Sequence, residues 1–451
     1  NAKESIELSL ELVEKAKSIQ NDTLLIKTIQ ETAYAHWYLG NYDEGIKLCN
    51  DLIPLLESQH KELVINITAQ NQLLLGNLNG DKGKPKDSLQ YYTDSLKLYQ
   101  EAENTLGIGY AFNNIGEVYR IQGKLDESLV CYLRSKEHFE QLDNQLDVAM
   151  TLSNMAEVYR EKGELKSALD FAFQSRNIQI TLEDNYVVAF TDITIGLIYH
   201  SQGNLNEAIK YYKSSVDTLS LRNNVLWTSQ ALYYYILALV EVDLDESTKQ
   251  LQLMQSLIEG NHEEVKLIDL QYKVLRAVIL KKSKTLSNLI KAQDLFTEIV
   301  KSKDIIDYSI SILAMKHLAE ILLIELKLFN NPDTLREFIE LIIDLRNIAE
   351  LHGSILLEIQ IYILIAKLKA IDGEYQSINE SLEFAYKLAK EKELSKFVKE
   401  IEKVRSEILD EINKYSGSEL EFEEIKKKVN QMNVEAYLNE ILLSEILSRK
   451  K

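Results

Sequence analysis

A recurring set of hydrogen-bonding side chains is the first feature of this sequence that could do chemistry. The two clearest copies, 40 residues apart, are Asn113, Asn114, Glu117 and Arg120, and Ser153, Asn154, Glu157 and Arg160. At about 3.6 residues per turn, the spacing within each copy puts its members on one side of a helix. Such side chains offer both donors and acceptors, which suit the backbone of an extended polypeptide. The pattern therefore predicts a surface that binds an extended polypeptide.

Side chains that catalyse reactions or bind metals show no comparable order. The 7 histidines are scattered, no two have ligand spacing, and neither Cys49 nor Cys131 lies at metal-site spacing from one. The glycine-containing loop 80–85 lacks the Gly-x4-Gly-Lys-Ser/Thr pattern and follows a helical segment, so it is interpreted as an enlarged turn. Each carboxylate is explained by an exposed helix surface. We therefore expect no enzyme activity, no metal and no cofactor.

Composition limits the fold and the partners. The chain has 451 residues, enough for two or three domains or one repeat array, and only 3 Pro and 16 Gly, which favours an all-helical fold. A net charge of −19 argues against binding to nucleic acid or anionic membranes. The sequence contains no apolar run of 18 residues, so no membrane span is predicted. The two isolated cysteines indicate a reducing compartment and hence a cytoplasmic protein.

An internal repeat organises the first half of the chain. Residues 113–135, 153–175 and 193–215 align without gaps at a period of 40, and weaker copies precede them. Gly123, Gly163 and Gly203 are predicted to end the first helix of each copy in the left-handed conformation. A helical position shared by four copies is expected to face a neighbouring helix closely, because it always carries serine: Ser95, Ser135, Ser175 and Ser215.

The repeat resembles the tetratricopeptide (TPR) family. The pattern that carries the resemblance is Phe112-x2-Ile115-Gly116-x2-Tyr119 followed by Ser128-x3-Tyr132. The period of 40 and the missing proline in the second helix are similar to the long repeats of kinesin light chain and the Pins-type adaptors. The resemblance covers residues 20–220 and implies a right-handed α-solenoid of stacked antiparallel helix pairs.

Four segments are expected along the chain. Residues 1–220 form the regular array, and residues 221–392 are predicted to continue the same solenoid as degenerate helical hairpins, because helical periodicity persists while the glycine landmarks fade. A charged capping helix over 393–415 and a short helical tail over 416–451 would follow.

The resemblance implies that the first helix of each pair lines a concave groove. The predicted partner-binding residues are Asn113, Asn114, Glu117, Arg120, Asn154, Glu157, Arg160, Thr194 and His200. Asn114 and Asn154 would hold a ligand backbone, Arg120, Arg160 and His200 would select acidic or polar side chains, and the glutamates would disfavour a strongly acidic ligand. The alternative for Glu117 with Arg120 is an ordinary i,i+3 pair without a ligand.

The main hypothesis is a non-enzymatic adaptor or scaffold that binds a protein or peptide in this groove. The alternative is a regulatory sensor, in which a signalling peptide or small ligand changes the pitch of the superhelix. An effector domain upstream of Asn1 in the full-length gene would favour the sensor. The sequence predicts neither the identity of the partner nor the oligomeric state.

Overall fold

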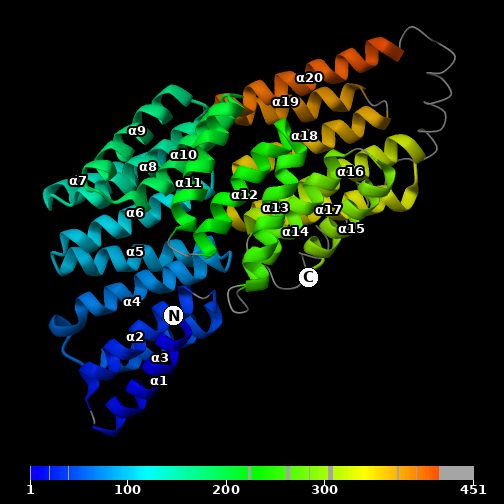
Figure 1. Ribbon diagram of the computed structural model, residues 1–451. Coiled ribbons are helices and arrows are strands. Elements are labelled where there is room, and N and C mark those ends of the chain that lie inside the picture. The colour runs from blue at the N-terminus through cyan, green and yellow to red at the C-terminus, as the bar shows by residue number, and fades with distance from the viewer. Residues whose placement is uncertain are drawn as a thin grey trace, which may run out of the picture. The chain divides into compact units, whose positions relative to one another are not determined.

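The computed structural model consists of helices that follow one another in antiparallel pairs (Figure 1). It describes residues 2–415 apart from 20, 39, 222–224, 261–264, 284, 303–307, 373–374 and 393, and the predicted tail over 416–451 lies outside these residues. The described residues contain helices and no strand, which confirms the all-α prediction. The chain divides into two compact units, Asn1–Ser311 and Ile312–Lys451.

The first unit is an array of helix pairs. Its helices are α1 (Ala2–Ser18), α2 (Asp22–Tyr38), α3 (Tyr42–Glu57), α4 (Lys61–Asp81), α5 (Pro85–Glu101), α6 (Thr105–Ile121), α7 (Leu125–Gln141), α8 (Gln145–Lys162), α9 (Leu165–Thr181), α10 (Asn185–Ser201), α11 (Leu205–Ser220), α12 (Val225–Val242), α13 (Leu244–Gly260), α14 (Val265–Lys282) and α15 (Leu286–Val300). We call the even-numbered helices from α2 to α14 the A helices, and the odd-numbered helices from α3 to α15 the B helices. Each A helix packs on its own B helix and also contacts the next A helix from α2 to α14, so the A helices form one continuous face.

Two different turns join the helices. Within a pair, the turn uses a left-handed glycine, as predicted: φ is +72° at Gly123, +80° at Gly163 and +78° at Gly203. Between pairs, the left-handed residue is not a glycine, since φ is +51° at Glu103 and +52° at Asp143. The sequence analysis missed this second turn because it searched only for glycine.

The turn between pairs is completed by a side-chain cap on the next A helix. The side-chain oxygen of Asn104 accepts from the backbone N–H of Gly107 at 2.9 Å, and that of Asn144 accepts from the backbone N–H of Asp147 at 3.3 Å. An asparagine immediately before a helix satisfies an N–H group that has no partner within the helix. The capping asparagine is therefore the sequence signal of this turn.

On α4, α6 and α10, a glycine makes room for a tyrosine on the B helix of the same pair. Gly76 faces Tyr92, and Gly196 faces Tyr212, whose nearest ring atom would lie 2.5 Å from an added Cβ. When the repeats are counted from the α4–α5 pair, the third repeat, α8–α9, has Ala156 and Ala172 at these two positions, and both are fully buried in one core cluster. A glycine facing a tyrosine and an alanine facing an alanine both allow the two helices to pack closely. An alanine facing the tyrosine does not, because its methyl group would overlap the ring.

The four predicted serines all lie between helices and are fully buried. Each hydroxyl donates to the carbonyl oxygen of an A-helix residue 26 positions earlier, at 2.6–2.9 Å. The acceptors are Ala69, Gly109, Ala149 and Ala189. The position therefore needs a side chain that is both small and a donor, which is a stricter requirement than the sequence predicted.

Helix α12 is the most apolar segment of the first unit. Among the described helices, only Val225–Val242 has the length and composition to cross a membrane, and 56% of that stretch is buried within the protein. It packs against α11, α13 and α14. This packing accounts for its composition as that of a core helix.

The second unit contains α16 (Tyr308–Phe329), whose first residues precede the unit boundary, α17 (Pro332–His352), α18 (Ile355–Asp372), α19 (Tyr375–Glu391) and α20 (Ser395–Tyr415). Helix α18 packs on α17 and α19, and α20 packs on both α18 and α19. Gly353 ends α17 in the left-handed conformation, with φ of +63°. A left-handed glycine therefore ends a helix outside the regular repeats as well.

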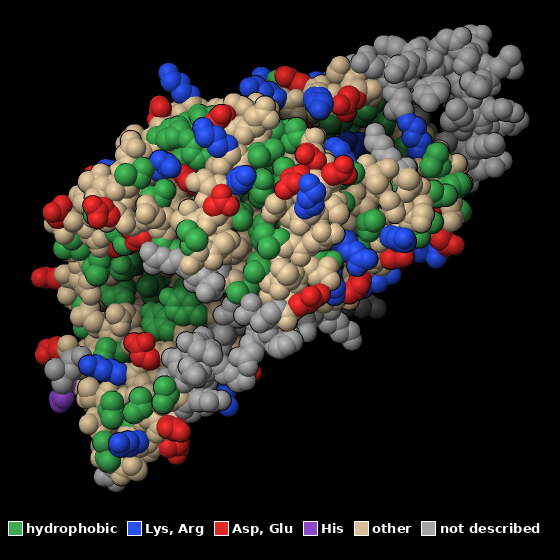
Figure 2. Space-filling model, in the orientation of Figure 1, with side chains coloured by type: hydrophobic (Ala, Val, Ile, Leu, Met, Phe, Trp, Pro, Cys, Tyr) green, Lys and Arg blue, Asp and Glu red, His purple; other side chains and the backbone are tan. Residues whose placement is uncertain are grey.

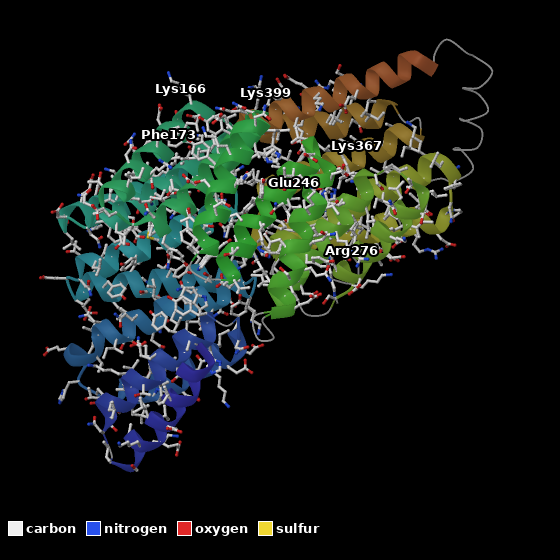
Figure 3. The ribbon with its side chains drawn as sticks, viewed as in Figure 1. Lys166, Phe173, Glu246, Arg276, Lys367 and Lys399 are labelled. Carbon is white, nitrogen blue, oxygen red and sulfur yellow. The ribbon has the colours of Figure 1, made fainter. Side chains whose placement is uncertain are left out.

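Lys316, on α16, is a partly buried amine in the second unit, with Lys367 of α18 (labelled in Figure 3) among its charged neighbours. Burial lowers the pKa of Lys316, and Lys367 lowers it further, while Glu400 and Glu320 act in the opposite direction without cancelling the effect. The unfolded chain therefore binds the proton more readily than the folded chain does as pH approaches the ordinary lysine pKa.

We predict that Lys316→Met stabilises the second unit at pH 7 by roughly 1 kcal/mol, the scale of the penalty for a buried polar group. A depressed lysine pKa makes the free energy of unfolding rise with pH until the unfolded lysine has titrated near pH ~10.4. The free energy of unfolding of the wild type should therefore rise relative to that of the variant as the pH increases through the alkaline range. Urea denaturation at several pH values measures both effects, and a constant difference between the two proteins would contradict the prediction.

Candidate ligand-binding face

The predicted binding residues lie on the side of the A helices that does not face the B helices. On α6 and α8 the residues around them, such as Ile115 and Met155, are buried, whereas Asn113, Asn114 and Asn154 are only partly buried. We call this surface of α4, α6, α8, α10 and α12 the A-helix face. Its side chains divide into three zones, which follow one another along α6 and α8 and continue in part onto the neighbouring A helices.

The middle zone is a row of amides joined across neighbouring A helices, which we call the amide ladder. Asn154 donates to the side-chain oxygen of Asn113 at 2.9 Å, and Asn114 donates to that of Asn77 at 3.1 Å. Asn77 is itself held by the hydroxyl of Tyr92 at 2.8 Å. The asparagine side chains thus donate to and accept from one another along the row. Asn77 is a member that the sequence analysis missed.

The ladder becomes less polar towards α10. Ser153 and Thr194 lie at the long distance of 3.4 Å, and Thr194 is largely buried. His200 of α10 belongs to the C-terminal zone, because it lies 40 residues after Arg160, and its Nε2 lies 3.1 Å from Glu241 of α12. Of the last two predicted residues, therefore, His200 is accessible and Thr194 is not.

The C-terminal zone of the A-helix face is a charged cluster. Arg120 donates from Nε to Glu117 at 2.9 Å and also pairs with Glu161 of the next repeat. Arg160 donates to Glu157 at 2.8 Å and lies 3.7 Å from the same Glu161. Three carboxylates thus surround two guanidinium groups, which gives the cluster a net charge of −1. The i,i+3 pairs exist as the alternative interpretation expected, but Glu161 joins them into a network between repeats.

The network keeps the Glu117 carboxylate ionised. Burial opposes ionisation of Glu117, but the Arg120 guanidinium and the hydroxyl of Tyr132, which donates at 2.9 Å, together hold its pKa below the usual value. Burial also lowers the pKa of Arg120, but Glu117 and Glu161 raise it above its ordinary value. Both members of the Glu117–Arg120 pair therefore carry their charges at neutral pH.

Two carboxylate oxygens of the cluster have no hydrogen-bond partner: one belongs to Glu157 and one to Glu161. The repeat pattern explains the first. In the second repeat Tyr132 donates to Glu117, but the third repeat has Ala172 in place of that tyrosine. Both of these oxygen atoms are buried, and each arginine of the cluster has a carboxylate partner.

The N-terminal zone of the A-helix face is apolar, and the sequence analysis did not identify it. We call its residues the apolar stripe: Leu106, Tyr110, Leu146, Met150, Tyr186, Phe190 and Trp227. Leu106 and Tyr110 are 38% exposed, Leu146 37%, Met150 49% and Trp227 40%. The rings of Phe190 and Trp227 meet edge to face at 4.7 Å, which continues the stripe from α10 to α12. Its signal in the sequence was recurrence at the period of the repeat.

Figure 2 shows acidic, basic and hydrophobic side chains interspersed on the side of the molecule that it draws. On the B helix α9, Phe173 (labelled in Figure 3) meets the ring of Tyr211 at a distance of 6.4 Å between ring centroids.

Comparison with known families agrees with this geometry. Family models described as tetratricopeptide repeat match residues 108–181 and residues 193–217. These repeats are tetratricopeptide repeats. The matched residues contain α7 to α9 whole and most of α6, α10 and α11, which carry all the binding residues predicted on the A-helix face. The resemblance inferred from the sequence is thereby confirmed.

Solved structures extend the likeness of fold beyond the matched TPR segments. A Rap protein complexed with competence and sporulation factor has a TM-score of 0.52 and 13% identity, over 81% of this chain and 98% of that one. The apo form of the quorum sensor NprR from B. thuringiensis has a TM-score of 0.47 and 16% identity, over 75% of this chain and 98% of that one. No curated protein matches the chain in sequence. The Rap likeness confirms a TPR-type helical solenoid.

Residues that could bind metal or act as nucleophiles do not gather on the TPR array. In the described part of the chain, no three His, Cys, Asp or Glu side chains lie close enough together to hold an ion. Cys49 and Cys131 are both buried thiols. Burial raises the pKa of Cys49 to about 12 and also raises that of Cys131. Both thiols are thus protonated at neutral pH and poor nucleophiles.

Proposed function

We propose that this TPR protein is an interaction module that holds an extended segment of a partner protein, or a peptide, on the A-helix face of α4 to α12. The amide ladder is the observation that carries the proposal. Asparagine is a mediocre helix former, yet it recurs at the partly exposed positions that neighbouring A helices share. Amides in a row offer an extended backbone regularly spaced partners. The protein would then act as an adaptor or scaffold.

The test is selection of peptides from a random display library on the wild type, followed by affinity measurements on Asn114→Ala/Asn154→Ala. Each lost hydrogen bond weakens binding by about 0.5–1.5 kcal/mol, so we expect the selected peptides to bind the variant about tenfold or more weakly. Asn177→Ala/Asn206→Ala changes two exposed asparagines on α9 and α11 and is the matched control. Equal affinity for all three proteins, with helicity retained, would exclude the A-helix face.

A regulatory sensor is the second candidate, and one observation favours it. The Rap structure, which resembles this chain over most of its length, is a complex with competence and sporulation factor. If this chain is likewise a sensor, peptide binding should change the pitch of the array. Small-angle scattering with and without a selected peptide separates the two functions. A changed radius of gyration supports the sensor, and an unchanged one supports the adaptor.

A further inference from the structure

We propose that the ligand of the A-helix face is an extended cationic segment with an apolar side chain at every third residue. This inference rests on the proposed function and adds the chemical class of the ligand. It comes from the order of the three zones: the apolar stripe at one edge, the amide ladder in the middle and the charged cluster at the other edge. A segment that lies on the ladder presents its side chains to both edges at once.

The repeat of the ligand follows from the repeat of the helices. Neighbouring A helices touch through their side chains, as Asn154 and Asn113 show at 2.9 Å, and packed helices lie about 8–10 Å apart. A polyproline-type chain rises about 3.1 Å per residue with three residues per turn, so it advances about one turn per repeat and presents every third side chain to the same edge. One ligand side chain in three therefore meets the stripe, once each on α6, α8, α10 and α12.

A helical ligand fits the ladder poorly. The backbone N–H and C=O groups of a helix are already used within it, whereas those of an extended chain are free. The ladder amides of Asn113, Asn114 and Asn154 would then have no backbone groups to bind. The combination of amides with a stripe therefore favours the extended form.

The charge of the ligand follows from the pairing in the charged cluster. Arg120 and Arg160 are already paired with glutamates, and the three carboxylates of Glu117, Glu157 and Glu161 outnumber these two guanidinium groups. A lysine or arginine of the ligand would offset the net charge of −1, whereas a ligand carboxylate would be repelled. This differs from the sequence hypothesis, in which the arginines select acidic or polar side chains and the glutamates disfavour only a strongly acidic ligand, because that hypothesis did not include Glu161.

The test uses a fluorescent peptide of four Leu-Ser-Lys triplets, which spans about four repeats. Two comparison peptides isolate its features: an isomer of equal charge with leucine at alternating positions, and a version with glutamate in place of lysine. We expect the triplet peptide to bind the full chain at least about tenfold more tightly than either. Equal anisotropy titrations for the triplet peptide and its isomer would overturn the proposal.

Paired variants locate the binding. Leu146→Ser/Met150→Ser removes part of the stripe, and Glu117→Gln/Glu157→Gln removes two charges. Each should weaken the triplet peptide about tenfold. The matched controls lie on the exposed surface of α7: Val130→Ser/Leu133→Ser and Glu127→Gln/Glu137→Gln should leave its affinity unchanged. Equal losses in variants and controls would show non-specific attraction to an acidic protein and defeat the proposal.

The proposed function and the proposed ligand class can be disproved separately. If library peptides bind in a manner that depends on Asn114 and Asn154 but the triplet spacing has no advantage, the ligand class is wrong and the interaction module stands. If no peptide depends on these asparagines, both are wrong.

Discussion

Gly196→Ala is expected to lower the free energy of unfolding by about 1–3 kcal/mol, although alanine is the better helix former. The added Cβ would lie 2.5 Å from Tyr212 Cε1 and 2.7 Å from Cδ1. These atoms belong to the body of a fully buried ring, which has no free space to move into. Overpacking of α10 against α11 therefore outweighs the helix propensity of about 1 kcal/mol. Urea denaturation followed by circular dichroism measures the difference.

The chain supplies its own control for this prediction. Its third repeat carries Ala156 and Ala172 where the fourth carries Gly196 and Tyr212. In a Tyr212→Ala background, Gly196→Ala should therefore become neutral or stabilise by up to about 1 kcal/mol, because the ring is gone and only the propensity remains. If Gly196→Ala destabilises both backgrounds equally, the ring is not the cause.

Ser135→Leu should have a larger effect, a loss of roughly 3 kcal/mol or more, from overpacking and a lost hydrogen bond together. Ser135 is fully buried between α7 and α6, and its hydroxyl donates to the carbonyl oxygen of Gly109 at 2.9 Å. A leucine at this position must push the two helices apart. The midpoint of urea denaturation reports the change, and that of Ser135→Leu should fall well below that of the wild type.

Ser135→Ala separates the two contributions. It removes the hydroxyl without adding volume, so it should cost only about 0.5–1.5 kcal/mol. The carbonyl of Gly109 keeps its place in α6, which limits the penalty. Equal losses for alanine and leucine would mean that the hydrogen bond alone determines the serine, and that α6 and α7 have room to adapt.

The turns show how far the fold could be predicted. Gly123, Gly163 and Gly203 were assigned correctly because a left-handed residue at a helix end strongly favours glycine. Glu103 and Asp143 adopt the same conformation without that signature. There the tertiary packing of consecutive pairs imposes the backbone, and local preference has little influence on residue type.

The candidate site was predicted as a face and not as a network. Helical periodicity placed Asn114, Asn154 and their neighbours on one side of the A helices. It could not predict that Arg120 reaches Glu161, because the offset between repeats decides which side chains meet. Contacts between A helices join residues 41 or 37 positions apart, whereas the sequence repeats every 40.

The sequence by itself determined the helix pairs, their period and the small residues between them, because backbone preference and close packing act at fixed positions of every repeat. Only the tertiary structure decided which donors meet which acceptors on the A-helix face, and that Met150 and Trp227 stay partly exposed there. Those properties depend on how far each A helix is shifted along its neighbour. A shift of one residue changes every partner without changing the period.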